Sequence, residues 1–257
     1  MKVNRLRYKL SYGNFKTKLC IVILCLILLL VYSNYELLAH KILRIDKPCL
    51  ISDEHMRRVT TLLKDVDKIL SDHKVVHWIT HGTLLGSFKR KGMLPWDYDG
   101  DIAYMLKNES MLVGPVADKL RQSGCQFTPE PAMDHFFVVS RDDVYLDLIG
   151  YTFYGEVSSW HKTRTLESAP HNDSIVRVIL PKDIFYIFFG CASHMPYHVI
   201  FPLKQCPFAQ HQLTCPNDPQ LLLSKHYCYT FPLGLNYPYK LNCWTNLSTA
   251  WTILTAN

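Results

Sequence analysis

The chain has 257 residues, of which 48% are hydrophobic and 19% charged, so its composition excludes an intrinsically disordered protein and allows one core of ordinary size. Lys and Arg number 28 against 22 Asp and Glu, a formal net charge of +6, but residues 1–35 contain six basic residues and no acidic one. The rest of the chain is therefore neutral, which argues against a nucleic-acid-binding domain, because such a domain needs a basic face of its own.

An apolar run from Leu19 to Tyr32 has fourteen residues without a charge, and it extends to seventeen at Tyr35. Seventeen helical residues span ~25 Å, close to the thickness of the thinner early secretory membranes. We predict a retained single-pass anchor over residues 19–35 rather than a cleaved signal peptide, because the preceding basic region is long and no small-residue cleavage site follows. The basic tail, residues 1–18, should stay cytosolic and the C-terminal bulk should face the lumen.

Sequons and cysteines agree with a luminal location. Three Asn-x-Ser triplets are candidate glycosylation sites: Asn108, Asn172 and Asn246. Four cysteines gather toward the C-terminal end: Cys206, Cys215, Cys228 and Cys243. In an oxidising lumen we expect one or two disulfides among them, and the absence of any Cys-x-x-Cys argues against zinc.

The luminal part begins with a short stem over residues 36–51 and continues as one domain over residues 52–257. Apolar residues at helical spacing predict an amphipathic helix of about five turns with Ser52 as its N-cap. The further predicted elements are, in chain order, a β-rich stretch at Val75–Thr80, a short helix from near Thr83, a strand at Asp101–Leu106, a helix at Ser110–Gln122, and a hairpin of Phe136–Ser140 with Val144–Tyr151. Strands and helices without a βαβ rhythm predict an α+β fold.

Three carboxylates alternate along the sequence at Asp97, Asp99 and Asp101. On an extended chain, side chains two residues apart point the same way, so these acids would repel one another on one face. A divalent cation removes that cost, and hard oxygen ligands suit Mg²⁺ or Mn²⁺. The alternative is an acidic surface turn beside a proline.

Residues before the acids suggest a phosphate site. Gly82 and Thr83 open a predicted helix, where backbone N–H groups can bind a phosphate, and His81 lies directly before them. Lys89 and Lys91 follow, and cations beside a metal suit a nucleoside diphosphate donor. A solvated charge run is the alternative for the two lysines.

Taken together, these stretches resemble the LicD family, which includes bacterial phosphocholine transferases, fukutin and fukutin-related protein. The motifs that carry the resemblance are Gly82-Thr83-Leu84-Leu85-Gly86, Lys91-Gly92 and Pro95-Trp96-Asp97-x-Asp99-x-Asp101-Ile102, with Phe201-Pro202-Leu203, Cys206-Pro207-Phe208 and Cys215-Pro216 downstream. The sequence departs from the family pattern at Lys89, where Arg is usual, at Tyr98, where Asp is usual, and at Gly100, where an apolar residue is usual.

The resemblance implies a nucleotidyltransferase-like mixed sheet with flanking helices. It also implies transfer of a phospho-alcohol, ribitol phosphate- or phosphocholine-like, from a CDP-activated donor to a glycan acceptor, with Asp99 and Asp101 as catalytic metal ligands. The predicted anchor agrees with the fukutin branch and a Golgi or ER membrane, with the catalytic domain in the lumen.

Such folds pair the first acidic strand with a later strand that carries one more acid. Asp147 is the candidate for this catalytic and metal-binding role, because its apolar strand would make a lone ionised carboxylate costly. An edge-strand acid that points to solvent is the alternative.

Two other functions stay open. A D-x-D glycosyltransferase that uses a nucleotide sugar would share the metal and the topology, although the Gly-Thr turn argues against it. A catalytically silent homologue that binds a glycan or escorts an enzyme is the other, and the three retained acids, Asp97, Asp99 and Asp101, argue against that.

Overall fold

The structure is a computed structural model, which describes residues 49–131, 134–153, 175–177 and 194–227, with residues 20, 22–26 and 28. The chain divides into two compact units, Met1–Cys49 with Tyr239–Asn246, and Leu50–Pro238 with Leu247–Asn257. In the first unit the described residues between 20 and 28 are helical and exposed. None of the helices in the described part of the chain could span a membrane, and most of the predicted anchor lies outside that part.

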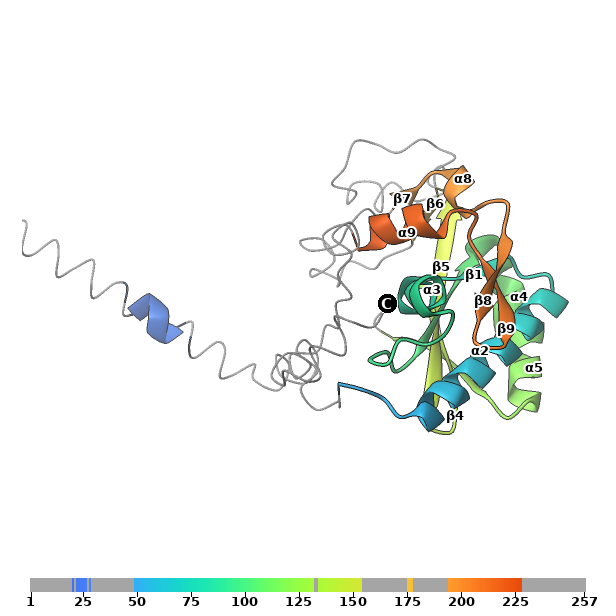
Figure 1. The fold of residues 1–257 in the computed structure, drawn as a ribbon, viewed down its shortest axis with the longest axis horizontal. Helices are drawn as coiled ribbons and strands as arrows, with labels where there is room; N and C mark the ends of the chain where they lie inside the picture. The colour runs from blue at the N-terminus through green and yellow to red at the C-terminus, as the bar shows by residue number, and fades with distance from the viewer. Residues whose placement is uncertain are drawn as a thin grey trace, which may run out of the picture. The chain divides into compact units, whose positions relative to one another are not determined.

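The second unit is built on a mixed sheet with the strand order β1-β2-β5-β4-β3 (Figure 1). The strands are β1 (His77–Ile79), β2 (Gly100–Met105), β3 (Gln126–Pro129), β4 (Phe136–Arg141) and β5 (Val144–Phe153), with β6 (Ile175–Arg177) on β5 and β7 (His194–Met195) on β6. β2 and β5 run parallel, whereas the other pairs are antiparallel. This mixed α+β architecture confirms the predicted fold class, and the predicted hairpin is β4 and β5.

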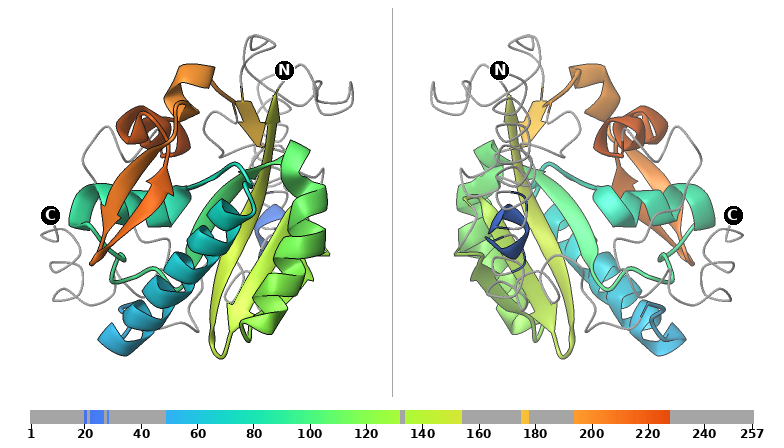
Figure 2. Two further views of the ribbon diagram at one scale, coloured as in Figure 1. Left: turned by 90° about the vertical axis from the view of Figure 1, so that its right-hand side faces the viewer. Right: turned by 90° about the vertical axis from the view of Figure 1, so that its left-hand side faces the viewer.

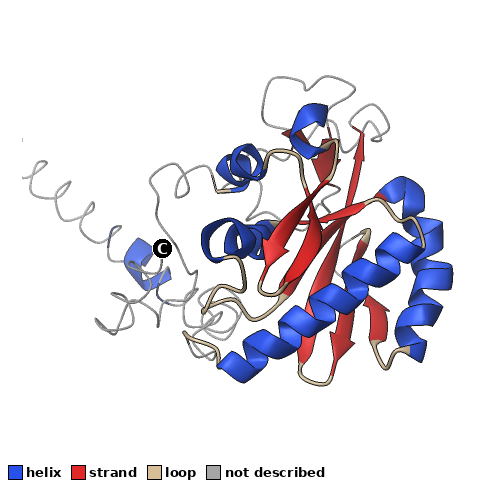
Figure 3. Cartoon of the chain, turned by 45° about the vertical axis from the view of Figure 1, so that its right-hand side comes forward, coloured by secondary structure: helices blue, strands red, loops and turns tan. Residues whose placement is uncertain are grey.

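Some helices pack against this sheet and others pack on those helices. They are α2 (Asp53–Asp72), α3 (His81–Arg90), η2 (Leu106–Asn108), α4 (Glu109–Met111), η3 (Leu112–Val116), α5 (Ala117–Gln122), α8 (Tyr197–Ile200) and α9 (Pro219–His226). The long α2 contacts β5 and α5 (Figure 3). Two views from opposite sides show α3 beside α9 and the hairpin of β8 (Lys204–Phe208) and β9 (His211–Cys215) (Figure 2).

One disulfide lies within the C-terminal cysteine cluster, where at least one was expected. Cys206 and Cys215 form a disulfide across the β8–β9 hairpin, as expected for the C-terminal cysteine cluster. Cys49 is disulfide-bonded as well, and Cys125 is a buried free thiol. Cys228 and Cys243 lie outside the described residues.

Helix α2 follows its sequence signals. The Ser52 hydroxyl accepts a hydrogen bond from the His55 N–H at 3.1 Å, and Asp53 and Glu54 occupy the first turn, where the helix dipole favours acids. The apolar stripe of Val59, Leu62, Leu63, Val66, Ile69 and Leu70 is buried. The predicted helix is therefore confirmed.

The single helix predicted over Ser110–Gln122 is wrong in its middle. Gly114 leaves helical geometry with φ −101° and ψ −108°, and Pro115 follows it. Since proline has no N–H and crowds the preceding turn, the helix breaks into α4, a π-type turn and α5.

Buried hydrogen bonds of Asp67 connect α2 to β1 and β9. The Asp67 Oδ1 atom lies 3.0 Å from His77 Nε2 and accepts from the Thr214 N–H at 3.0 Å. The other ring nitrogen of His77 donates to the Val75 carbonyl at 2.8 Å. One carboxylate therefore satisfies two buried groups that come from separate elements.

Replacement of Asp67 by Ala should lower the free energy of unfolding by about 3–5 kcal/mol, because it leaves the His77 imidazole and the Thr214 N–H buried without their acceptor. Urea denaturation measures this change. Asp72→Ala is the matched control on the same helix, since Asp72 is 57% exposed and pairs with Lys68 at the surface. That substitution should cost less than about 0.5 kcal/mol. Equal losses in the two variants would contradict the structural role of Asp67.

Candidate active site

The first turn of α3 binds the carboxylate of Asp101. The Gly82 N–H donates to Asp101 Oδ2 at 3.0 Å, and the Thr83 N–H approaches the same oxygen at 3.4 Å. The Asp101 N–H in turn donates to the Thr83 hydroxyl at 2.7 Å. These bonds replace a side-chain N-cap, since Thr80 at that position makes none, and they place a negative charge at the positive end of the helix dipole.

Gly82 lets a second carboxylate approach the same turn. A Cβ atom at this position would lie 2.0 Å from Asp97 Oδ2 and 3.4 Å from Asp101 Oδ2. No real Cβ tolerates the first distance, so the carboxylate of Asp97 lies where it does because residue 82 has no side chain, whereas the second distance is an ordinary contact. This explains the glycine in physical terms.

Asp147 lies beside Asp101 in the sheet. The two residues are register partners in the parallel pair of β2 and β5. Directly paired residues on neighbouring strands project to the same face, so Asp147 shares the face of Asp101. The structure thus brings the later acidic strand next to the first one.

Burial and three neighbouring acids act on the carboxyl group of Asp101. Burial, first, and then the carboxylates of Asp99, Asp97 and Asp147 raise the pKa of Asp101 well above its ordinary value, although the Thr83 N–H opposes this. Asp101 as a residue is half-buried, between fully buried and exposed. Both burial and three like charges therefore oppose the ionisation of Asp101.

The chemistry of this donor set fits a divalent cation. Carboxylate oxygens are the hard ligands that Mg²⁺ and Mn²⁺ prefer, and a cation would remove the repulsion that the four acids impose on one another. Among the described residues, no group of three or more His, Cys, Asp or Glu side chains is already arranged to coordinate a metal ion. The fit is therefore one of charge and ligand type.

The predicted phosphate-binding residues are spread along α3. Gly82 and Thr83 direct their N–H groups at Asp101, and the ring of His81 stacks on that of His226 with centroids 4.3 Å apart. Lys89 lies in the last turn, about 10 Å along the axis from Gly82 but on the same helical face. Lys91 is the exposed C-cap, about 13 Å from Gly82 along the axis. Lys91 therefore lies at the opposite end of α3 from the turn that contacts Asp101.

The other predicted positions have local explanations. At Gly100 a Cβ would lie 2.6 Å from Leu146 Cδ2 and 2.8 Å from Leu63 Cδ2, so these leucines fill the space of the apolar residue usual in the family. The side chain of Asn108 accepts from the Val76 N–H at 3.1 Å and is half-buried. The candidate glycosylation sites Asn172 and Asn246 lie outside the described residues.

No sequence pattern indicated that His55 would lie beside the acids. His55, on α2, lies with its Nε2 atom 2.7 Å from the carbonyl oxygen of Tyr98, between Asp97 and Asp99. A lone histidine 43 residues before its partner has no local pattern, and only the tertiary structure reveals the contact.

Comparison with known proteins assigns this fold and site to a class. The sequence matches a nucleotidyltransferase domain, described as LicD/FKTN/FKRP, over residues 74–218, which is more than half of the chain. The chain belongs to this LicD family, as its motifs predicted, and membership indicates a transferase.

Two curated relatives are uncharacterized proteins. One, from Rickettsia prowazekii (strain Madrid E), is 24% identical over 177 residues, and one from Rickettsia typhi (strain ATCC VR-144 / Wilmington) is 23% identical over 180 residues. Each match covers 69% of this chain, but 56% and 48% of the two relatives. The chain therefore spans about half the length of the curated relatives it matches.

Two solved structures of ANT(2'')-Ia are similar over most of the chain. The crystal structure in complex with adenylyl-2''-tobramycin is 14% identical with a TM-score of 0.35, over 77% of this chain and 95% of that one. The solution structure of this antibiotic-resistance factor is 13% identical with a TM-score of 0.36, over 78% and 91%.

The raised pKa of Asp101 makes a prediction for stability. The folded protein binds this proton more tightly than the unfolded chain, so ionisation of Asp101 costs stability as the pH rises from 3.8, its ordinary value, through the raised value. Asp101→Asn should therefore raise the free energy of unfolding of the metal-free protein at neutral pH, by about 0.5–2 kcal/mol. The gain should vanish in acid.

Urea denaturation in EDTA over a pH series measures this effect. Asp118→Asn is the control, because Asp118 is exposed and pairs with Arg121 on the surface. A loss of stability in Asp101→Asn at neutral pH would contradict the repulsion among the acids.

Proposed function

We propose that this chain is a metal-dependent phosphotransferase that moves a phospho-alcohol from a CDP-activated donor to a glycan acceptor. The observation that carries the proposal is the set of Asp97, Asp99 and Asp147 around Asp101, whose carboxylate is bound at the first turn of α3. Family membership supports the transferase class. The CDP donor, the glycan acceptor and the metal are the parts that we propose beyond it.

In this mechanism the acids bind the metal and Lys89 faces the donor phosphates. Asp99, Asp101 and Asp147, with Asp97, would bind Mg²⁺ or Mn²⁺, which when bound neutralises negative charge on the donor pyrophosphate. Asp101 is the anchored member, because α3 fixes its carboxylate. Lys89 lies on the helical face of Gly82 and would contribute positive charge toward the donor phosphates.

The transfer step exchanges one oxygen–phosphorus bond for another. A carboxylate of the set, for which Asp147 is our candidate, accepts the proton of the acceptor hydroxyl. The acceptor oxygen forms a bond to the phosphorus that carries the alcohol, and the bond from that phosphorus to the bridging oxygen breaks. CMP leaves with that oxygen, so the glycan gains a phosphodiester.

A donor panel tests this function. Purified protein is incubated with CDP-ribitol, CDP-choline and several nucleotide sugars, with glycan acceptors and with or without Mn²⁺. We expect CMP release and a phosphodiester product from a CDP-alcohol, only with metal. Sugar transfer from a nucleotide sugar would instead identify a glycosyltransferase, and no turnover of any donor would favour a silent homologue.

Substitutions of the four acids should lower transfer activity to different extents. Asp147→Asn should lower kcat by about 10²–10⁴-fold, because it removes a proton acceptor and a metal ligand, while the urea midpoint changes little. Asp99→Ala and Asp101→Ala should abolish transfer, and Asp97→Ala should be severe but partial. Asp142→Asn is the matched control in the same hairpin, since Asp142 is exposed in the turn before β5. Near-normal activity of Asp147→Asn would exclude the residue from the site.

We also propose a Golgi or ER membrane location with the catalytic domain in the lumen, motivated by the charge asymmetry around residues 19–35. Protease added to intact microsomes should spare the bulk of the chain, and detergent should expose it. Endoglycosidase should lower the apparent mass if a sequon is used. Complete digestion without detergent would rule out this topology.

A further inference from the structure

The N-terminal end of α2 is attached to the acidic loop on both sides of Asp97. The Ile51 N–H donates to the Pro95 carbonyl at 2.7 Å. His55 Nε2 lies 2.7 Å from the Tyr98 carbonyl oxygen, and the two rings meet edge to face with centroids 5.5 Å apart. Because a carbonyl only accepts, the Nε2 atom carries the proton and donates it. Asp97 is thus flanked by two fixed carbonyls.

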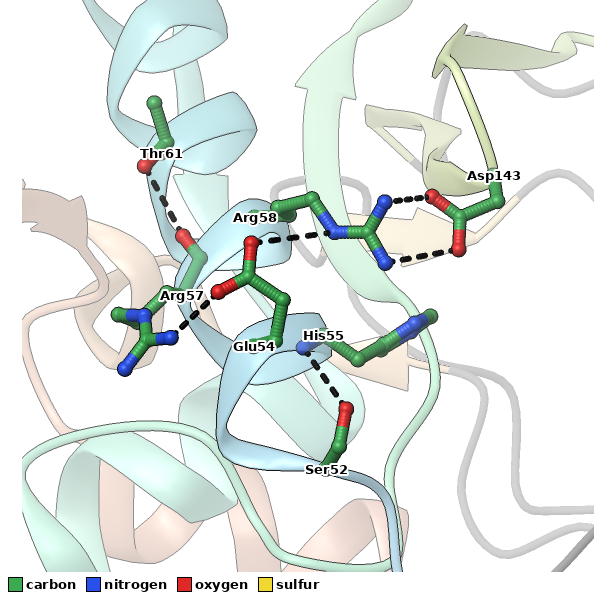
Figure 4. Close-up of polar contacts among 7 residues, drawn as sticks. All are labelled: Ser52, Glu54, His55, Arg57, Arg58, Thr61 and Asp143. Carbon is green, nitrogen blue, oxygen red and sulfur yellow. Dashed lines mark hydrogen bonds and ion pairs between the residues drawn. The ribbon is translucent and has the colours of Figure 1, made fainter.

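The same turn of α2 also contacts the turn that leads into β5, the strand that carries Asp147. Arg58 forms a bidentate ion pair with Asp143, in which two guanidinium nitrogens donate to the two carboxylate oxygens at 2.5 Å and 2.9 Å (Figure 4). Asp143 lies in the turn between β4 and β5, directly before the strand that carries Asp147. One turn of helix therefore reaches both segments that bring acids to the site.

Helix α2 is a firm support for these contacts. Its apolar stripe is buried, and the Ser52 hydroxyl caps the His55 N–H (Figure 4). The residues that match the LicD/FKTN/FKRP description begin at residue 74, so α2 lies before them. Like charges at Asp97, Asp99 and Asp101 would drive a free loop apart. The hydrogen bond from His55 to the Tyr98 carbonyl holds the loop backbone against this repulsion.

We propose that His55 is a positioning residue, which fixes the backbone between Asp97 and Asp99 through the Tyr98 carbonyl and so sets where these carboxylates meet Asp101. Its effect on transfer rests on the proposed function, whereas its effect on the loop does not. The hydrogen bond needs only a proton on Nε2, so a side chain with a donor at the same reach can replace the imidazole.

Two substitutions isolate the donor. In His55→Gln the amide nitrogen lies as many bonds from Cα as Nε2 does and can donate to Tyr98, whereas His55→Leu fills similar volume without a donor. His55→Asn, which is too short to reach, is the second loss variant if His55→Leu folds poorly. Arg57→Ala is the matched control, because Arg57 lies in the same turn, is 71% exposed and pairs with Glu54.

The first measurement is hydrogen exchange in the peptide over residues 94–101. The Asp97 N–H donates to the Leu94 carbonyl at 3.0 Å, so its protection reports directly on the loop. We expect faster exchange in the Leu and Asn variants, with the wild-type rate in the Gln variant and the control. Equal exchange in the Leu and Gln variants would overturn the proposal.

The second measurement is Mn²⁺ affinity, from the free-ion EPR signal, together with kcat and KM. We expect the Leu variant to lose about 10-fold in Mn²⁺ affinity and kcat, with recovery in the Gln variant. Faster exchange with unchanged Mn²⁺ affinity would overturn the positioning role. If the wild-type protein transfers no donor at all, the proposed function fails, but hydrogen exchange and Mn²⁺ binding still decide on His55.

Discussion

Hydrogen bonds from the first turn of α3 to the carboxylate of Asp101 are the interaction on which the site depends. They join the helix to β2 and use N–H groups that a helix start must otherwise leave to water or a capping side chain. The reciprocal bond from the Asp101 N–H to the Thr83 hydroxyl fixes the strand edge at the same point. Gly82 is required there, because Asp97 approaches where a side chain would begin.

This anchoring has an electrostatic cost. The helix end stabilises one negative charge, but burial, and then the charges of three neighbouring carboxylates, raise the pKa of Asp101. Such a cluster lowers stability by itself, and in the function that we propose a bound cation would offset its repulsion. On that proposal the fold accepts lower metal-free stability in exchange for carboxylates gathered where a cation would bind.

Much of this could be predicted from the sequence where the pattern is local. Alternation singled out the acids of residues 97–101, although Asp97 and Asp99 lie before β2 rather than on it. Periodicity predicted α2, and the apolar setting of Asp147 singled out that residue. The register of β2 with β5 could not be predicted, because parallel pairing is a tertiary property, and it is what places Asp147 beside Asp101. The contact of His55 with Tyr98 had no signal for the same reason. The place of Lys91 at the far end of α3 from Gly82 depends on how far that helix extends, and the predicted role of Lys91 in donor binding stays a prediction.

Anomalous diffraction from crystals grown with Mn²⁺ and a CDP-alcohol tests the central claim most directly. Our account predicts a manganese peak within ligand distance, about 2.0–2.3 Å, of carboxylate oxygens from Asp101 and at least one of Asp99 and Asp147. The donor phosphates should lie against that ion, near the first turn of α3. A manganese peak elsewhere, or a donor bound away from Asp101 without metal, would contradict it.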